Sequence, residues 1–160
     1  ELARMRTLGR KKINDQVYEA TAYPTHVSKE NIFDLIKFAR DRGTPRFRIC
    51  LHNSIHDEVQ EMIMVILDFG ETPIHRTTRS KGQNCTTSYH IIYGSCIVQQ
   101  HDHRLKVIQN FHLSSDAEKN PMAVRLDGRV WRSMKITSDT CIFLETATGP
   151  FCRESTEWSK

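Results

Sequence analysis

The spacing of hydrophobic positions changes once along the chain, from a helical period to a strand period near residue 45. Before that point the pattern predicts one helix over Lys29 to Arg42, which Ser28 can cap at its start and Gly43 can end. Four residues at i, i+3, i+4 and i+7 spacing form its apolar stripe: Ile32, Leu35, Ile36 and Ala39. We therefore expect an amphipathic helix that packs on a sheet through this stripe.

After residue 45 apolar and polar residues alternate, which is typical of half-buried strands. The run 59–70 fits a helix by composition, but its β-branched residues and the closing Gly70 favour a strand. The polar tip 101–103 lies between two alternating runs and predicts a hairpin. Further short alternating runs follow at 122–128, 130–136 and 140–147. The chain is therefore predicted to be mostly β, an antiparallel barrel or sandwich with one N-terminal helix.

Length and composition indicate one domain: 160 residues are enough to enclose a single core. No apolar run reaches the roughly 18 to 20 residues of a membrane span, and the first residues do not form a signal segment. The five cysteines have no zinc-type spacing, and Cys50, Cys96 and Cys141 lie inside strand-like runs, so we expect buried, reduced thiols. These features predict a cytoplasmic protein.

The net charge of +4 resides in residues 1–12, which carry five Lys or Arg side chains and one Glu. The other 148 of the 160 residues are neutral on balance. A nucleic-acid interface would place its positive charges on a folded face, with aromatic residues among them. We therefore expect a basic N-terminal arm or linker over residues 1–12, a folded domain over residues 13–160, and no nucleic-acid partner.

Several motifs of this chain resemble those of the cupin superfamily, and more narrowly those of the small WbuC-type cupins of polysaccharide gene clusters. They are "RFRICLHNSIHDEVQEM", "PIHR", "SYHIIYG", "VRLDGRVWRSM" and the most specific one, "FLETATGPFCRESTEW". The resemblance extends over nearly the whole chain from about Lys12. It implies a single cupin-type jelly-roll β-barrel and a carbohydrate-related function in surface polysaccharide biosynthesis.

In the family that the chain resembles, a His-x-His pair, a Glu and a later His hold a divalent metal inside the barrel. On this sequence these positions fall at His75, Thr77, Thr87 and Arg132. Threonine hydroxyls are poor substitutes for imidazole or carboxylate, and an arginine is always protonated and repels a cation. We therefore expect a degenerate metal site with no bound cofactor, in which His75 is the one retained ligand position.

A retained divalent metal is the alternative, with His75 joined by other histidines. The candidates are His52, His56, His90 and His112. His101 and His103 of "HDH" imitate a ligand pair, but at a hairpin tip we expect them to be exposed residues of a turn.

The positions that replace the metal ligands can bind a small polar molecule. Arg132 could hold a ligand carboxylate or phosphate, or could instead pair with a carboxylate of the protein such as Glu145. The predicted ligand-binding set is His75, Thr77, Thr87, Tyr89 and Arg132. We expect a non-catalytic domain that binds a sugar, a sugar nucleotide or another anionic ligand, with Tyr89 able to stack on a sugar ring.

Two other functions remain open at this point. A metal-free sugar-nucleotide epimerase or isomerase could use His75 as general base and Tyr89 as general acid, although no carboxylate is spaced to orient His75. The chain could also be a structural domain that forms homodimers, or a part of a longer chain.

Overall fold

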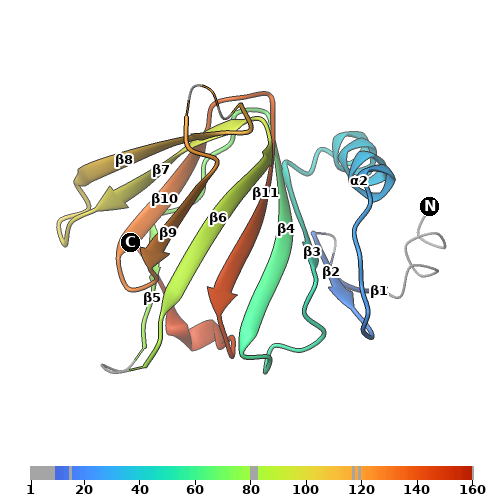
Figure 1. Ribbon diagram of the computed structural model, residues 1–160, viewed down its shortest axis with the longest axis horizontal. Coiled ribbons are helices and arrows are strands. Elements are labelled where there is room, and N and C mark those ends of the chain that lie inside the picture. The colour runs from blue at the N-terminus through green and yellow to red at the C-terminus, as the bar shows by residue number, and fades with distance from the viewer. Residues whose placement is uncertain (1–9, 15, 80–82, 117, 119, 160) are drawn as a thin grey trace.

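The computed structural model describes residues 10–159 except 15, 80–82, 117 and 119. The described chain is mostly β, with one α-helix, α2 (Lys29–Asp41), and one short 3-10 helix, η1 (Arg153–Ser155). The strands are β1 (Arg10–Asn14), β2 (Val17–Ala20), β3 (Arg46–Cys50), β4 (Val59–Leu67), β5 (His75–Thr77), β6 (Thr86–Tyr93), β7 (Ser95–His101), β8 (Val107–Ser114), β9 (Ala123–Asp127), β10 (Trp131–Ile136), β11 (Thr140–Thr148) and β12 (Thr156–Trp158). Figure 1 shows the strands in two layers, with α2 beside β3 and β4. The predicted mostly-β class with one N-terminal helix is confirmed.

Helix α2 begins at a capping box. Ser28 Oγ accepts a hydrogen bond from Asn31 N at 3.3 Å, and the Asn31 side chain accepts one from Ser28 N at 3.0 Å. The apolar side chains that α2 packs against the sheet are Ile32, Leu35, Ile36, Phe38 and Ala39. They cover the outer face of β2, β3 and β4, so the predicted stripe is confirmed and the inner face of these strands stays available for a cavity.

Seven strands form the larger sheet, in the order β1-β2-β3-β4-β11-β6-β9, and five form the smaller sheet, in the order β12-β5-β10-β7-β8. Paired strands of the described chain are antiparallel with one exception, because β2 and β3 run parallel. Helix α2 lies between these two strands in the chain and returns it across the sheet, which is the connection that a parallel pair needs. The prediction of a wholly antiparallel sheet is wrong at this pair.

The two sheets face each other across a shared hydrophobic core. Ile91 and Phe143 reach this core from the larger sheet, and Val98 and Met134 reach it from the smaller one. Strand pairing does not join the two sheets in the described part of the chain. The molecule is therefore a sandwich of two sheets, and the closed barrel stays an unconfirmed part of the prediction.

Several predictions concern single segments. The run 59–67 forms strand β4, and β7 and β8 form the predicted hairpin. Residues 1–9 of the predicted basic arm lie outside the described residues, while residues 10–12 belong to β1 and pair with β2. No helix in the described chain is both long enough and apolar enough to cross a membrane.

Candidate functional site

A cavity of about 980 Å³ lies between the inner faces of the two sheets. Its walls come from β2, β3, β4 and β11 of the larger sheet and from β5, β10 and β12 of the smaller one. Four of the five predicted ligand-binding residues line it, namely His75, Thr77, Tyr89 and Arg132. The fifth, Thr87, is buried on β6 two residues before Tyr89 and therefore faces the same way. The structure thus brings the predicted set together.

Arg132 places a buried positive charge beside this cavity, with only 4% of the residue exposed. Its Nε donates to the Tyr89 hydroxyl at 3.0 Å, and its Nη1 donates to the Gly128 carbonyl at 2.8 Å. Its Nη2 makes no hydrogen bond with the described residues. Burial acts to lower the pKa of Arg132, but Tyr89 and then Glu145 raise it by more, so the net shift is upward. Arg132 is therefore a fixed cation with donors to spare.

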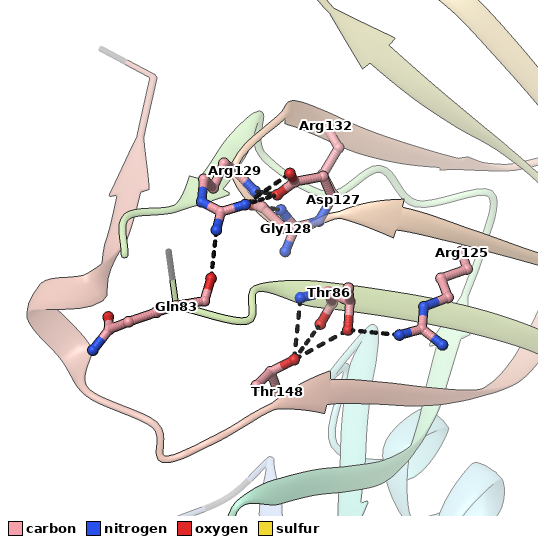
Figure 2. A network of polar contacts seen from close by, with 8 residues as sticks. All are labelled: Gln83, Thr86, Arg125, Asp127, Gly128, Arg129, Arg132 and Thr148. Atoms are coloured by element: carbon pink, nitrogen blue, oxygen red, sulfur yellow. Dashed lines mark hydrogen bonds and ion pairs between the residues drawn. The ribbon is translucent and has the colours of Figure 1, made fainter. Parts of the chain in front are cut away.

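The turn that precedes β10 positions the Gly128 carbonyl that accepts the hydrogen bond from Arg132 Nη1. The Asp127 carboxylate accepts a hydrogen bond from Arg129 N at 2.9 Å and one from Arg129 Nη1 at 2.8 Å. Figure 2 shows this turn, with the Arg129 side chain on the Asp127 carboxylate. The Gly128 carbonyl accepts from Arg132 Nη1 and also from Thr77 N at 2.7 Å. The turn therefore connects Arg132 to the strand that carries His75 and Thr77.

His75 lies on β5, directly across from Arg132 on β10. Its Nδ1 is 2.8 Å from the Pro73 carbonyl, which assigns the proton to Nδ1 and leaves a lone pair on Nε2. The ring packs on Trp158 of β12, with centroids 5.1 Å apart. Burial, and then the Arg132 cation, lower the pKa of His75 to about 4. His75 is therefore neutral near pH 7.

Tyr89 is a core residue as much as a cavity residue. It is 5% exposed, and its ring packs edge-on against Phe143 with centroids 5.8 Å apart. Burial raises the pKa of its phenol, whose oxygen accepts the hydrogen bond from Arg132. Tyr89 therefore orients the guanidinium, and its ring has no free face for the predicted stacking on a sugar.

Glu145 of β11 is paired in register with Tyr89 and lines the same cavity. Burial raises the pKa of Glu145, against the lowering effect of Arg132 and then Arg48. The hydrogen bonds of Arg132 go to other groups, so the two charges interact without a direct ion pair. Thr87 Oγ1 is buried without a hydrogen bond of normal geometry, yet it lies close enough to lower the pKa of Glu145 and of Tyr89.

Basic residues outnumber acidic ones along the cavity, with five Lys or Arg against two Glu. Lys11 pairs with Glu19 at 3.7 Å, and Arg79 donates to three backbone carbonyls. Arg46 and Arg48 on β3 are exposed, and neither forms an ion pair within the described part of the chain. The cavity therefore carries an excess of positive charge, which favours an anion.

The four positions that correspond to metal ligands do not fit a divalent cation. His75 offers one nitrogen, Thr77 and Thr87 offer hydroxyls, and Arg132 brings a positive charge to the position directly across from His75. No three His, Cys, Asp or Glu side chains of the described residues are grouped so that they could hold an ion. The absence of a metal remains a prediction, which this donor set supports.

Apart from His75, one histidine of the described residues, His52, lines the cavity. His52 is buried, lines the cavity, and accepts from Glu61 N at 3.1 Å through Nδ1. The exposed histidines are His26, His56, His90, His103 and His112. His101 ends β7 and is 6% exposed, with Nε2 3.0 Å from Ser133 Oγ. The prediction of an exposed turn residue is therefore wrong for His101, because the side chain points into the sheet packing.

Trp158, Arg46 and Arg48 are among the cavity residues that sequence reasoning missed. Trp158 is 55% exposed on the cavity rim and packs on His75. Trp158 is the last residue of the motif that most specifically resembles the family, and this position in the motif could have indicated its role in the site. The alternating pattern of β3 places Arg46 and Arg48 on one face, but only the packing of the sheets shows that this face lines the cavity.

No protein-family model matches this chain, and no curated protein matches it. Solved structures do match. A mutant of salicylate 1,2-dioxygenase from Pseudoaminobacter salicylatoxidans is 10% identical, with a TM-score of 0.61 over 83% of this chain and 38% of that chain. The capsular polysaccharide assembling protein CapF from Staphylococcus aureus is 10% identical, with a TM-score of 0.53 over 65% of this chain and 27% of that chain. Oxalate decarboxylase from Bacillus subtilis is 14% identical, with a TM-score of 0.51 over 71% of this chain and 27% of that chain.

All three neighbours are cupin superfamily proteins. This chain has a cupin-like fold. At 10 to 14% identity the likeness shows the fold alone, and the chain spans only 27 to 38% of the length of these neighbours. The cupin part of the resemblance is thus confirmed for the fold, while the WbuC part remains a prediction.

Proposed function

We propose that this cupin-like domain binds a small anionic ligand in the cavity between its sheets, with Arg132 as the anion-binding group and without a metal. The observation that carries the proposal is the Arg132 guanidinium, which is buried, holds two hydrogen bonds within the protein and has no hydrogen-bond partner on Nη2 among the described residues. A buried cation costs several kcal/mol in desolvation unless it is paired. A ligand carboxylate or phosphate would provide the opposite charge and accept the spare donors.

Apart from Glu145, which opposes an anion, the polar side chains around Arg132 are neutral or positive and suit such a ligand. His75 has a pKa of about 4, so it adds no charge near pH 7, and its Nε2 can accept a hydrogen bond from a hydroxyl of the ligand, not from the anionic group. Thr77 lines the same wall and offers a hydroxyl. Thr87 and Tyr89 lie deeper and support the site through Glu145 and Arg132.

We place this function in surface polysaccharide biosynthesis, as a WbuC-type small cupin. Acidic sugars, sugar nucleotides, sugar phosphates and other carboxylates are the candidate ligands. The setting is supported by the family-like motifs, above all "FLETATGPFCRESTEW", and by the fold shared with CapF, a capsular polysaccharide assembling protein.

A metal-free epimerase or isomerase that uses His75 and Tyr89 is the weaker alternative. A pKa of about 4 makes His75 a poor general base near pH 7. Burial raises the pKa of the Tyr89 phenol, which makes it a poor general acid. The polar groups are better suited to holding a ligand than to moving its protons.

The proposal is tested by comparing glucuronate with glucose, which share a ring and differ in the carboxylate. Glucuronate should raise the melting temperature of the protein and give a binding isotherm, and its affinity should fall as salt is added. Glucose should do neither. Equal effects of both sugars, or no binding by glucuronate, glucose 1-phosphate or benzoate, would show that the cavity is not an anion site.

A further inference from the structure

The inner face of the larger sheet carries a second cationic position, on β3. Arg48 pairs with Met64 on β4, and Met64 pairs with Phe143 on β11. Since neighbouring strands lie about 4.8 Å apart, Arg48 is two spacings, or about 10 Å, from the backbone of β11. Arg46 precedes Arg48 by two residues and points to the same face. Of the five Lys and Arg side chains that line the cavity, Arg132 lies on the smaller sheet, and Arg46 and Arg48 lie on β3 of the larger sheet.

Both arginines of β3 keep their charges available to the cavity. Arg48 reaches the Met62 sulfur at 3.9 Å, and a thioether is only a weak acceptor. Arg46 contributes to the lowered pKa of His75, and Arg48 opposes the rise that burial causes in the pKa of Glu145. These effects show that the two charges act on groups inside the cavity although the side chains are exposed.

The surface between the two cationic positions carries two thioethers and the Glu145 carboxyl. Met62 and Met64 line the cavity from β4, in register between β3 and β11. A sugar ring over these thioethers would leave hydroxyls unpaired, whereas an alkyl or aryl body would bury apolar surface. Glu145 lies beside Met62 in the register and repels an acidic group at the centre of a ligand.

We infer that the cavity takes an elongated dianion with an apolar centre, such as a linear or aromatic dicarboxylate. One acidic group binds Arg132, the second binds Arg46 and Arg48, and the body of the ligand lies over Met62 and Met64. This inference rests on the proposed function and favours, among its candidate ligands, carboxylates with an apolar body over acidic sugars. A monoanion would leave the β3 pair unused.

The test is calorimetry with dicarboxylates of increasing length, namely succinate, adipate, suberate and sebacate. Each is compared with the monocarboxylate of the same chain length. Affinity should pass through a maximum at intermediate length, where the best dicarboxylate should bind about tenfold more tightly than its monocarboxylate through one added charged contact. The double variant Arg46→Gln/Arg48→Gln should lose this advantage, so that it binds each dicarboxylate no more tightly than the matching monocarboxylate. Arg104→Gln/Arg125→Gln, which removes the same charge from exposed sites outside the cavity, is the matched control.

The outcomes separate this inference from the proposed function. If suberate and octanoate bind wild type equally and both need Arg132, the second anion position is wrong and the proposed function stands. If the dicarboxylate advantage persists in Arg46→Gln/Arg48→Gln, the β3 pair is not the second position. If no carboxylate binds wild type at all, both proposals fail.

Discussion

Replacing Arg132 by methionine should separate ligand binding from stability. The change keeps an unbranched side chain and removes the charge and the hydrogen bonds to Tyr89 and Gly128. The Gly128 carbonyl keeps its hydrogen bond from Thr77 N, while the buried Tyr89 hydroxyl loses its partner, which costs about 1–3 kcal/mol. Removal of a buried cation offsets this cost by relieving several kcal/mol of desolvation. We therefore expect the free energy of unfolding to change by no more than about 2 kcal/mol in either direction.

Binding should respond far more strongly than stability. A carboxylate held by Arg132 would lose two charged hydrogen bonds, each worth about 1.5–3 kcal/mol. Each 1.4 kcal/mol is a tenfold change in affinity, so the dissociation constant should rise by at least about 100-fold. Calorimetry with a carboxylate that binds wild type measures the affinity, and urea denaturation measures the stability. Arg125→Met is the matched control, since it removes the same charge from an exposed residue on β9.

Two results would refute this reasoning. One is an Arg132→Met protein that binds the same carboxylates as tightly as wild type, because the anion would then bind elsewhere. The other is a markedly stabilised Arg132→Met protein with no carboxylate shifting either form. That result would show that Arg132 is a structural residue whose buried charge lowers the free energy of unfolding and does not bind an anion.

Three further predictions address Glu145, the metal and the fold. Glu145→Gln should tighten carboxylate binding near neutral pH, because it removes a negative charge near Arg132 and Arg48. A bound anion should raise the already raised pKa of Glu145, so wild type should take up a proton on binding, with affinity rising as pH falls. Calorimetry in two buffers of different ionisation heat measures this uptake, and equal uptake by Glu145→Gln would contradict the assignment. Elemental analysis after mild purification should find no stoichiometric transition metal, whereas about one equivalent per chain that disappears in His75→Ala would overturn the prediction. Gly94→Ala should destabilise the fold by about 1–3 kcal/mol, because Gly94 has φ +79° and an added Cβ would lie 2.1 Å from the backbone carbonyl oxygen of Thr140. An unchanged midpoint of urea denaturation would contradict this prediction.

Elements with a local signal could be predicted from the amino-acid pattern. The capped helix α2 follows from Ser28 and a stripe of period 3.6, and the strands follow from alternation of period two. The resemblance to the cupin motifs placed His75, Thr77 and Arg132 in the candidate site, and alternation from Thr87 added Tyr89. The structure brings these four residues to one cavity. Alternation supports such an assignment because a strand turns each side chain to one of two faces.

The neighbours of each strand face depend on how distant strands pair and how the two sheets pack. The parallel pairing of β2 with β3 joins strands separated in the chain by a helix, and the burial of His101 depends on its contact with Ser133 of another strand. Arg46 and Arg48 alternate as any surface strand would, and they become cavity residues because β3 lies two strands from β11. Spacing along a chain sets the direction of a side chain, whereas the neighbour it meets depends on long-range pairing, which local periodicity does not encode.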